Sequence, residues 1–323
     1  MATLDAFRGS QSTTSTRKRS LENTWGKIKR GWQLYLMLLI PLAWLLIFQY
    51  WPMYGAQIAF RNYMPGESFL GSPWVGLANF IEFFNSYMFV RVLRNTLWIS
   101  FYSLLVGFPI PIIFALAINQ LSGSWFKRTL QMVSYAPYFI STVVVVGIII
   151  QLLDLRRSPI NLLLQALGIS TINFMGSPEW FPSIYVWSGI WQFTGFSAII
   201  YLAVLSTVDP ALHEAAVVDG ANRLQRIWYV DLQTILPTAM TLLILNMGQL
   251  MNVGFEKTFL LQNTLNQTTS EVISTYVYKV SLAAGIATYS YGAAIGLFNS
   301  FVGLILIVIA NQVSKKTTET GLW

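Results

Sequence analysis

The chain has 323 residues, of which 54% are hydrophobic and only 10% are charged, and its net charge is +7. Soluble globular domains carry roughly 25% charged residues, so this composition excludes an ordinary soluble protein and favours one that crosses a bilayer several times. The absence of cysteine excludes a disulfide framework and a thiolate site, and a single histidine argues against a metal centre.

A basic segment at 1–31 begins the chain, and we expect it to lie in the cytoplasm. Its positive charges adjoin the first apolar run, where they would contact anionic lipid headgroups, so membrane lipid is expected as a partner and nucleic acid is not. The apolar run itself is about 20 residues long and lacks a small-residue cleavage site, which favours a retained first span over a signal peptide. We therefore expect no processing.

Six apolar segments are long enough to cross a hydrocarbon core about 30 Å thick as helices. Each run is continuous and does not alternate with polar residues, which favours helices over barrel strands. The predicted fold class is therefore an all-α integral membrane protein, with a transmembrane domain at 32–313 and a cytoplasmic tail at 314–323. The spans are expected at about 32–52, 96–119, 130–153, 183–206, 238–261 and 291–313.

The distribution of Lys and Arg sets the orientation. With the N-terminus inside, 13 of the 20 basic residues fall in cytoplasmic segments, so both termini are expected in the cytoplasm. The first outside segment, 53–94, contains turn residues and an aromatic patch around Phe83, and we expect it to form a small cap. Residues 262–290 are expected to form a loop with a short helix.

The cytoplasmic segment between the fourth and fifth spans, 207–237, is the most informative part of the chain. Asp209 can cap a helix that begins at Pro210, whose missing amide proton costs nothing there. Gly220 tolerates the left-handed backbone of a helix end, and a second helix is expected from about Asn222 to Tyr229. The segment could be an ordinary loop, but a helix, a glycine bend and a second helix would make a knob for a soluble partner.

The pattern in this knob resembles the signature of ABC importer permeases. The pattern consists of Glu214, Ala215 and Ala216, then two further residues, and then Asp219, Gly220 and Ala221. The resemblance covers roughly residues 34–313 and implies the six-helix fold of type I importer permeases. It also implies that the knob is a coupling helix that docks into a cleft of a cytoplasmic ATPase, with Glu214 available to an arginine of that partner. Gln233 departs from the family pattern, which has proline there.

Two further segments are similar to the carbohydrate branch of that family. Residues 74–80 are similar to the VGLxNF segment of maltose-type permeases, and residues 319–323 are similar to the tail of LplB-type polysaccharide permeases, relatives of the alginate importer subunits. The resemblance implies a bacterial inner-membrane location and an oligosaccharide or polysaccharide substrate. The implied partners are a second permease subunit, two cytoplasmic ATPase subunits that hold ATP and Mg, and an external substrate-binding protein.

Several other functions are disfavoured by what the sequence lacks. No G-x-x-x-x-G-K-S/T phosphate loop occurs, so ATP hydrolysis is expected on another chain. No acidic residue lies in the middle of a predicted span, since Asp154 and Glu256 fall at edges, which disfavours a proton-coupled secondary carrier. His213 beside Glu214 is more often a surface residue than a general base, so an enzyme is not expected. The secondary carrier is the alternative function, and a membrane-anchored scaffold or sensor is a third.

Polar residues within two spans are candidates for the sugar path. Asn246, Gln249 and Asn252 follow one another at intervals of three residues, so they could form a stripe on one face of span five. Amides bind sugar hydroxyls and aromatic rings pack beneath sugar rings, which adds three candidates in span four. These are Trp187, Trp191 and Gln192. Polar packing between helices explains any one of the six residues equally well.

Overall fold

The structure is a computed structural model that describes residues 30–66, 68, 71–283 and 288–318. Nearly all of these residues are helical, and the one β-bridge among them joins Arg61 and Trp74. The chain divides into two compact units, residues 1–57 and 58–323.

The described part of the first unit is one apolar helix that runs on into the start of the second unit. The helix combines α2 (Trp32–Leu45), the π-helix η1 (Leu46–Tyr50), α3 (Trp51–Met53) and the 3₁₀ helix η2 (Tyr54–Phe60). It carries no charged residue and is long and apolar enough to cross a membrane. Pro41 lies inside α2.

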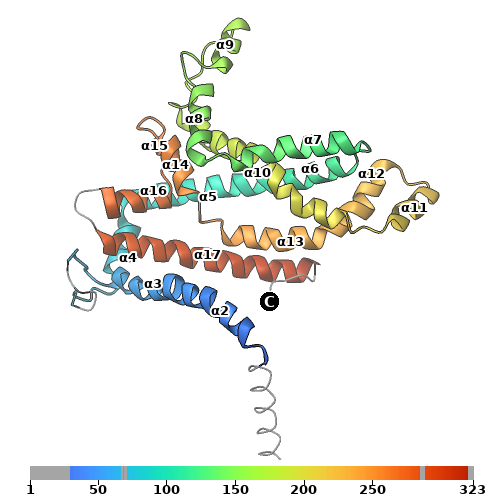
Figure 1. The fold of residues 1–323 in the computed structure, drawn as a ribbon. Coiled ribbons are helices and arrows are strands. Elements are labelled where there is room, and N and C mark those ends of the chain that lie inside the picture. Colours follow the sequence, from blue (N-terminus) through green and yellow to red (C-terminus); the bar gives the residue numbers. More distant parts are fainter. Residues whose placement is uncertain (1–29, 67, 69–70, 284–287, 319–323) are drawn as a thin grey trace, which may run out of the picture. The chain divides into compact units, whose positions relative to one another are not determined.

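The second unit contains the other helices (Figure 1). The first half comprises α4 (Ala78–Asn85), α5 (Tyr87–Gly107), α6 (Pro109–Asn119), α7 (Ser124–Tyr135), η3 (Ala136–Phe139), α8 (Thr142–Leu152) and α9 (Pro159–Ala166). The next elements are η4 (Pro178–Trp180), α10 (Phe181–Leu205), α11 (Pro210–Val218), α12 (Arg223–Arg226), the π-helix η5 (Ile227–Asp231) and α13 (Leu232–Gly248). The last are α14 (Phe255–Leu261), α15 (Gln267–Ser270), α16 (Ile273–Tyr278), η6 (Lys279–Ala283) and α17 (Tyr289–Thr318).

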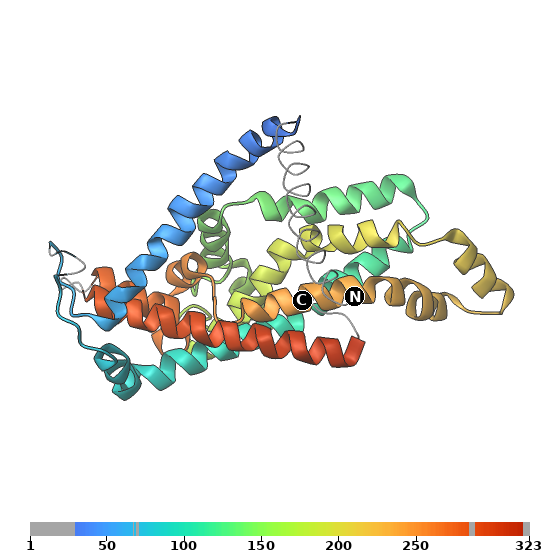
Figure 2. The same ribbon diagram turned by 90° about the horizontal axis from the view of Figure 1, so that it is seen from below.

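The long helices of this unit form a bundle around α10. Helix α10 packs against α5, α6, α7 and α13, and α13 packs against α17. Gly195 allows α7 and α10 to approach closely, because a Cβ atom at this position would lie 2.1 Å from the Ser134 carbonyl oxygen. In both ribbon views α11 and α12 lie at one end of the bundle, and α4 and α16 lie at the opposite end (Figures 1 and 2).

Three apolar clusters hold the bundle together. One joins α6, α10 and α13 through Ala115, Tyr201 and Ile235. A second lies around Ile99 and includes residues of α8 and α14. The third lies around Phe83 at the α4 end. Because lipid tails are as apolar as these side chains, the clusters hold the helices together mainly through close van der Waals packing.

The aromatic patch predicted in the first outside segment packs against the last long helix. Phe83 is fully buried, and its ring makes edge-on contacts with Phe89, Tyr291 and Phe298. Helix α4 therefore packs against the N-terminal part of α17. Residues 262–283 form three short helical elements, α15, α16 and η6, where the sequence predicts one short helix.

Two predicted spans differ from single straight helices. Five helices in the described residues can cross a membrane, or six if a bent pair counts as one span. The bent pair, Ser124–Phe139 and Thr142–Leu152, turns by 100° within the predicted span 130–153. The predicted span 238–261 is also divided, because the apolar helix in this region runs over Arg223–Gly248 and α14 is separate. Residues 249–261 therefore do not continue the helix, and three of their apolar side chains are buried inside the bundle, those of Met251, Val253 and Leu261.

Candidate functional site

Helix α11 begins and ends where its local chemistry predicts. The Asp209 carboxylate accepts a hydrogen bond from the Ala211 N–H at 2.9 Å, and Pro210 is the first helical residue. At the other end Gly220 has a φ of +79°, and its N–H donates to Val217 O at 3.0 Å. The Ala221 N–H donates to the Ala216 carbonyl at 2.8 Å, so the helix ends in a Schellman motif.

The signature residues lie on the surface of this short helix and its cap. Glu214, Ala215, Asp219 and Gly220 are exposed, whereas Ala216 and Ala221 are half-buried. No basic group lies within 4 Å of the Glu214 carboxylate in the part of the chain that the structure describes. The carboxylate is therefore accessible to another molecule at the end of the bundle where α11 lies (Figure 1).

The second half of the knob is continuous with the apolar helix Arg223–Gly248. Asn222 caps α12 in a reciprocal box with Gln225, and the chain then passes through the π-helix η5 into α13 without a break. The prediction of a separate second helix ending near Tyr229 is therefore wrong in its end point. Gln233 stands where the family pattern has proline, so its N–H is available and the helix can run on.

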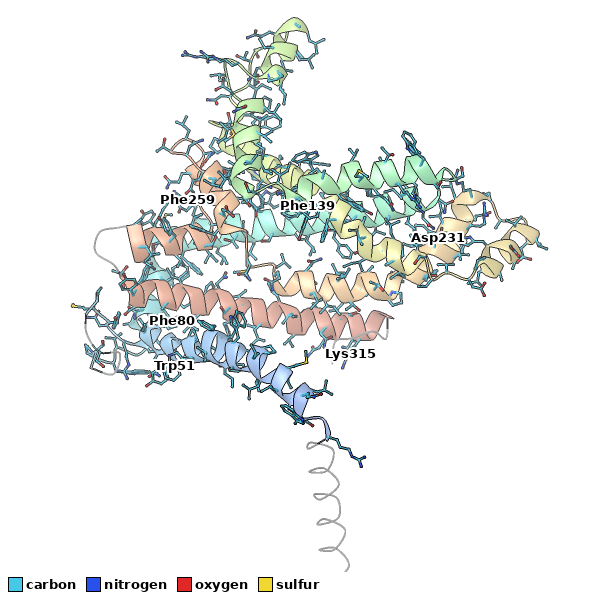
Figure 3. The ribbon with its side chains drawn as sticks, in the orientation of Figure 1. Trp51, Phe80, Phe139, Asp231, Phe259 and Lys315 are labelled. Carbon is cyan, nitrogen blue, oxygen red and sulfur yellow. The ribbon has the colours of Figure 1, made fainter. Side chains whose placement is uncertain are left out.

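A polar network joins the knob to the bundle. His213 of α11 places its Nε2 atom 3.2 Å from Oδ1 of the fully buried Asp231. The other carboxylate oxygen of Asp231 accepts a hydrogen bond from the Gln120 side chain at 2.8 Å. Arg223 of α12 donates to the side-chain oxygen of Gln120 at 3.1 Å and also to its carbonyl. We call His213, Asp231, Gln120 and Arg223 the latch; Figure 3 labels Asp231 at the α11–α12 end.

The latch was not apparent from the sequence. His213 reads as a surface residue, yet it is only 28% exposed and pairs with a carboxylate. The contact joins residues from two helices whose packing no local pattern specifies. The available signal was a single acidic residue, Asp231, beside the apolar run of the fifth span, since such a charge needs a partner when it is buried.

A cavity of about 710 Å³ lies between α5, α10, the end of α13 and residues 249–257. Asn246, Gln249 and Asn252 all line it, together with Ser100 and Ser103 of α5. The helical-stripe argument for the three amides is wrong in detail, because α13 ends at Gly248 and only Asn246 lies on it. The chain beyond α13 nevertheless brings Gln249 and Asn252 to the same cavity.

The amides in this cavity are connected to one another. Asn252 donates to the side-chain oxygen of Gln249 at 2.8 Å, and Asn299 of α17 donates to Asn252 at 3.2 Å. Gln249 and Asn252 are exposed and keep further donors and acceptors for a ligand. Their role in a sugar path stays a prediction.

The three candidates from span four do not line the cavity. Trp187 and Trp191 are 53% and 51% exposed on α10, and the Trp187 indole N–H donates to the Tyr102 hydroxyl at 3.0 Å. Gln192 is buried and donates to the carbonyl of Ile140 at 3.1 Å, at the bend between η3 and α8. Gln192 thus gives a hydrogen-bond partner to a carbonyl that the break in the helix leaves free. This contact is polar packing between helices and not a contact with sugar.

Comparisons with known proteins agree with this architecture. Residues 107–319 match the family described as binding-protein-dependent transport system inner membrane component. The chain is 41% identical over 296 residues to Protein LplB of Bacillus subtilis (strain 168), covering 92% of both chains. It is 42% identical over 290 residues to the polygalacturonan/rhamnogalacturonan transport system permease protein YteP of the same organism, covering 90% of both.

A solved structure gives the same result at the level of the fold. The crystal structure of a bacterial ABC transporter involved in the import of the acidic polysaccharide alginate contains a chain that superposes with a TM-score of 0.84. The two chains are 40% identical, and the match covers 92% of this chain and 99% of the other. The fold is thus that of an ABC importer permease, and this multi-pass membrane protein belongs to the family of inner membrane components of binding-protein-dependent transport systems.

Proposed function

We propose that this chain is one transmembrane subunit of an ATP-driven importer that takes up an oligosaccharide or polysaccharide from a substrate-binding protein. Relatives at about two-fifths identity carry names of polysaccharide transport, and one solved relative is in complex with an alginate pentasaccharide-bound periplasmic protein. The observation that carries the proposal is the juxtaposition, in one bundle, of an exposed coupling helix and an amide-lined cavity.

The proposed mechanism uses both ends of the bundle. Helix α11 docks on a cytoplasmic ATPase subunit, which holds ATP and Mg, and the Glu214 carboxylate meets a basic group there. When the ATPases close, the latch carries the displacement of α11 to the ends of α6 and α13, because Asp231 contacts both His213 and Gln120. The second permease subunit supplies the other half of the path, and the amides at the end of α13 hold the sugar as it passes.

Reconstitution tests this function against a secondary carrier. The assembled complex in proteoliposomes should hydrolyse ATP faster when the sugar-loaded binding protein is added, and its uptake should not respond to a proton gradient. Uptake by this chain alone, driven by a gradient and without ATP, would establish the secondary carrier and overturn the proposal.

A charge reversal tests the docking role of α11. Glu214→Lys should release the ATPase or uncouple hydrolysis from transport, because a charge-assisted contact worth about 1.5 to 3 kcal/mol becomes repulsive. Glu179→Lys is the matched control, since Glu179 is an exposed glutamate that precedes α10. If Glu214→Lys and Glu179→Lys bind the ATPase and transport sugar equally well, α11 is not the docking element.

The proposed orientation places both termini in the cytoplasm. Because the chain has no cysteine, single cysteines at residues 10 and 318 can report on each terminus separately. Both should react with a membrane-impermeant thiol reagent only after the cytoplasmic side is opened. Labelling of either from outside would contradict the orientation.

A further inference from the structure

The cavity contains a buried cation that lies near the end of the predicted span 238–261. Lys257 of α14 is 7% exposed and lines the cavity. Its ammonium donates to the Tyr185 carbonyl at 2.9 Å and lies 4.9 Å from the centre of the Tyr185 ring. In the part of the chain that the structure describes, no carboxylate lies within 4 Å of this ammonium.

A buried ammonium without a counter-ion is unusual. Lysine is almost never fully buried unless it is paired, because its charge loses hydration. The ammonium has three donors, of which the Tyr185 carbonyl takes one, and the ring face gives partial compensation. Lys257 therefore keeps the capacity to donate to an anionic acceptor in the cavity.

The surroundings of Lys257 suit a sugar more than a simple ion. The volume of about 710 Å³ lies in the range of small-molecule sites, and the amides of Asn246, Gln249 and Asn252 share the lining. The partly exposed side chains of Ser100 and Ser103 also line the cavity and add hydroxyl groups. The cavity thus combines amide and hydroxyl donors with a single cation.

We propose that Lys257 is the counter-charge for a carboxylate of the transported saccharide, so that this cavity favours sugars containing uronic acid over neutral ones. The inference rests on the proposed function, since it concerns the same cavity. It adds a specificity-determining residue that contacts the acid group, while the neighbouring amides contact hydroxyls.

The protonation state of Lys257 fits this role. Burial lowers the pKa of Lys257 to about 8, so the ammonium is mostly charged at pH 7. A carboxylate that enters the cavity would favour the charged form further. The segment that carries Lys257 has a second anchor, because the Gly254 N–H donates to the Tyr185 hydroxyl at 3.0 Å. Removing the charge should therefore leave α14 in place.

The test compares an anionic sugar with its neutral form in the assembled complex. The substrates are trigalacturonate and the same trisaccharide with its carboxyl groups methyl-esterified, each supplied with the binding protein. The measured quantity is the ATP-dependent uptake rate of the anionic sugar into proteoliposomes, divided by the uptake rate of its neutral ester. Comparing this ratio between variants cancels the preference of the binding protein itself.

Lys257→Gln keeps a donor for the Tyr185 carbonyl but removes the charge, and it should lower the ratio at least about 10-fold, the size expected for loss of one charge-assisted contact. Lys257→Arg should preserve the ratio. Lys315→Met is the matched control, because Lys315 is an exposed lysine near the end of α17 (Figure 3). Its ratio should equal that of the unmodified chain.

Two outcomes separate this inference from the proposed function. If Lys257→Gln slows uptake of both sugars equally, or changes neither, Lys257 only anchors α14 to α10 and the inference is wrong while the transport function stands. If the unmodified complex takes up neither sugar in the presence of ATP, the proposed function fails, and the inference fails with it.

Discussion

Replacement of Gly220 by valine tests whether the shape of the knob matters for coupling. Gly220 has a φ of +79°, and a Cβ atom added there would meet no heavy atom within 4 Å. A valine side chain would therefore not be crowded, and its whole free-energy cost comes from the backbone conformation. A left-handed backbone costs an ordinary L-residue about 1 to 2 kcal/mol, and a β-branched side chain makes the position a stronger outlier.

The penalty acts directly on the end of α11. Both Schellman hydrogen bonds, from Gly220 to Val217 and from Ala221 to Ala216, require this backbone conformation. A cost of about 1 to 2 kcal/mol shifts the population of the native cap by roughly 5- to 30-fold. The rate of coupled ATP hydrolysis should fall by a similar factor if the misshaped knob cannot dock.

The assay is ATP hydrolysis and sugar uptake by the reconstituted complex at matched membrane expression. Gly220→Asn is the control, because asparagine tolerates the left-handed region far better than valine, and it should keep most of the activity. Both variants should insert normally, since Gly220 lies outside the membrane-spanning helices. Equal, normal transport by the two variants would refute the reasoning that the cap shapes a docking element.

Three further results are expected. Asp231→Ala should lower the melting temperature of the complex and weaken coupling more than Asp231→Asn does. The reason is that alanine leaves the partners of Asp231 in the latch without hydrogen bonds, which costs about 1 to 3 kcal/mol. Equal melting temperatures for the two variants would contradict this. Gln249→Leu should slow uptake while basal ATPase activity survives, and loss of assembly would indicate packing instead. Uptake of an anionic sugar should fall as the pH rises from about 7 to 9, because Lys257, whose titratable contact is Tyr185, loses its charge near its pKa of about 8. A flat profile in the unmodified complex, matching that of Lys257→Arg, would contradict this last expectation.

The features of the knob were predictable because they depend on neighbouring residues. An aspartate before a proline specifies where α11 begins, and a glycine after nine helical residues specifies where it ends. These local rules hold whatever the rest of the chain does. The apolar runs likewise predicted helices correctly, since runs of about 20 residues have no other solution in a bilayer.

The interruptions of the spans were less predictable. Residues 238–261 read as one apolar run, and Gly248 and Gly254 lie inside it without specifying a break. The structure ends α13 at Gly248 because the following residues enter the bundle, where Met251 and Val253 are buried. Periodicity cannot distinguish burial in protein from burial in lipid, because both environments are apolar.

The polar parts of the site depended on tertiary contacts. Gln192 looked like a sugar ligand, but it compensates a carbonyl at a bend whose geometry the sequence does not specify. Lys257 falls near the end of the predicted span 238–261, and its burial arises from contacts with Tyr185 of α10, 72 residues earlier in the chain. In each case the side-chain chemistry was evident from the sequence, while its neighbours came from helices far away in the chain.

The π-helix η5 determines how the side chains of α13 are rotated about the helix axis relative to those of α12. The Leu232 N–H bonds to the Ile227 carbonyl five residues back, so this turn holds one more residue than an α-helical turn would. Deleting one residue within Ile227–Asp231 would allow a regular α-helix but would rotate the latch relative to α13 by about 100°. Asp231 and the amides at the far end of α13 would then no longer face their present partners at the same time. The extra residue thus fixes the angle between the latch, at one end of this helix, and Asn246, which lines the cavity at the other end.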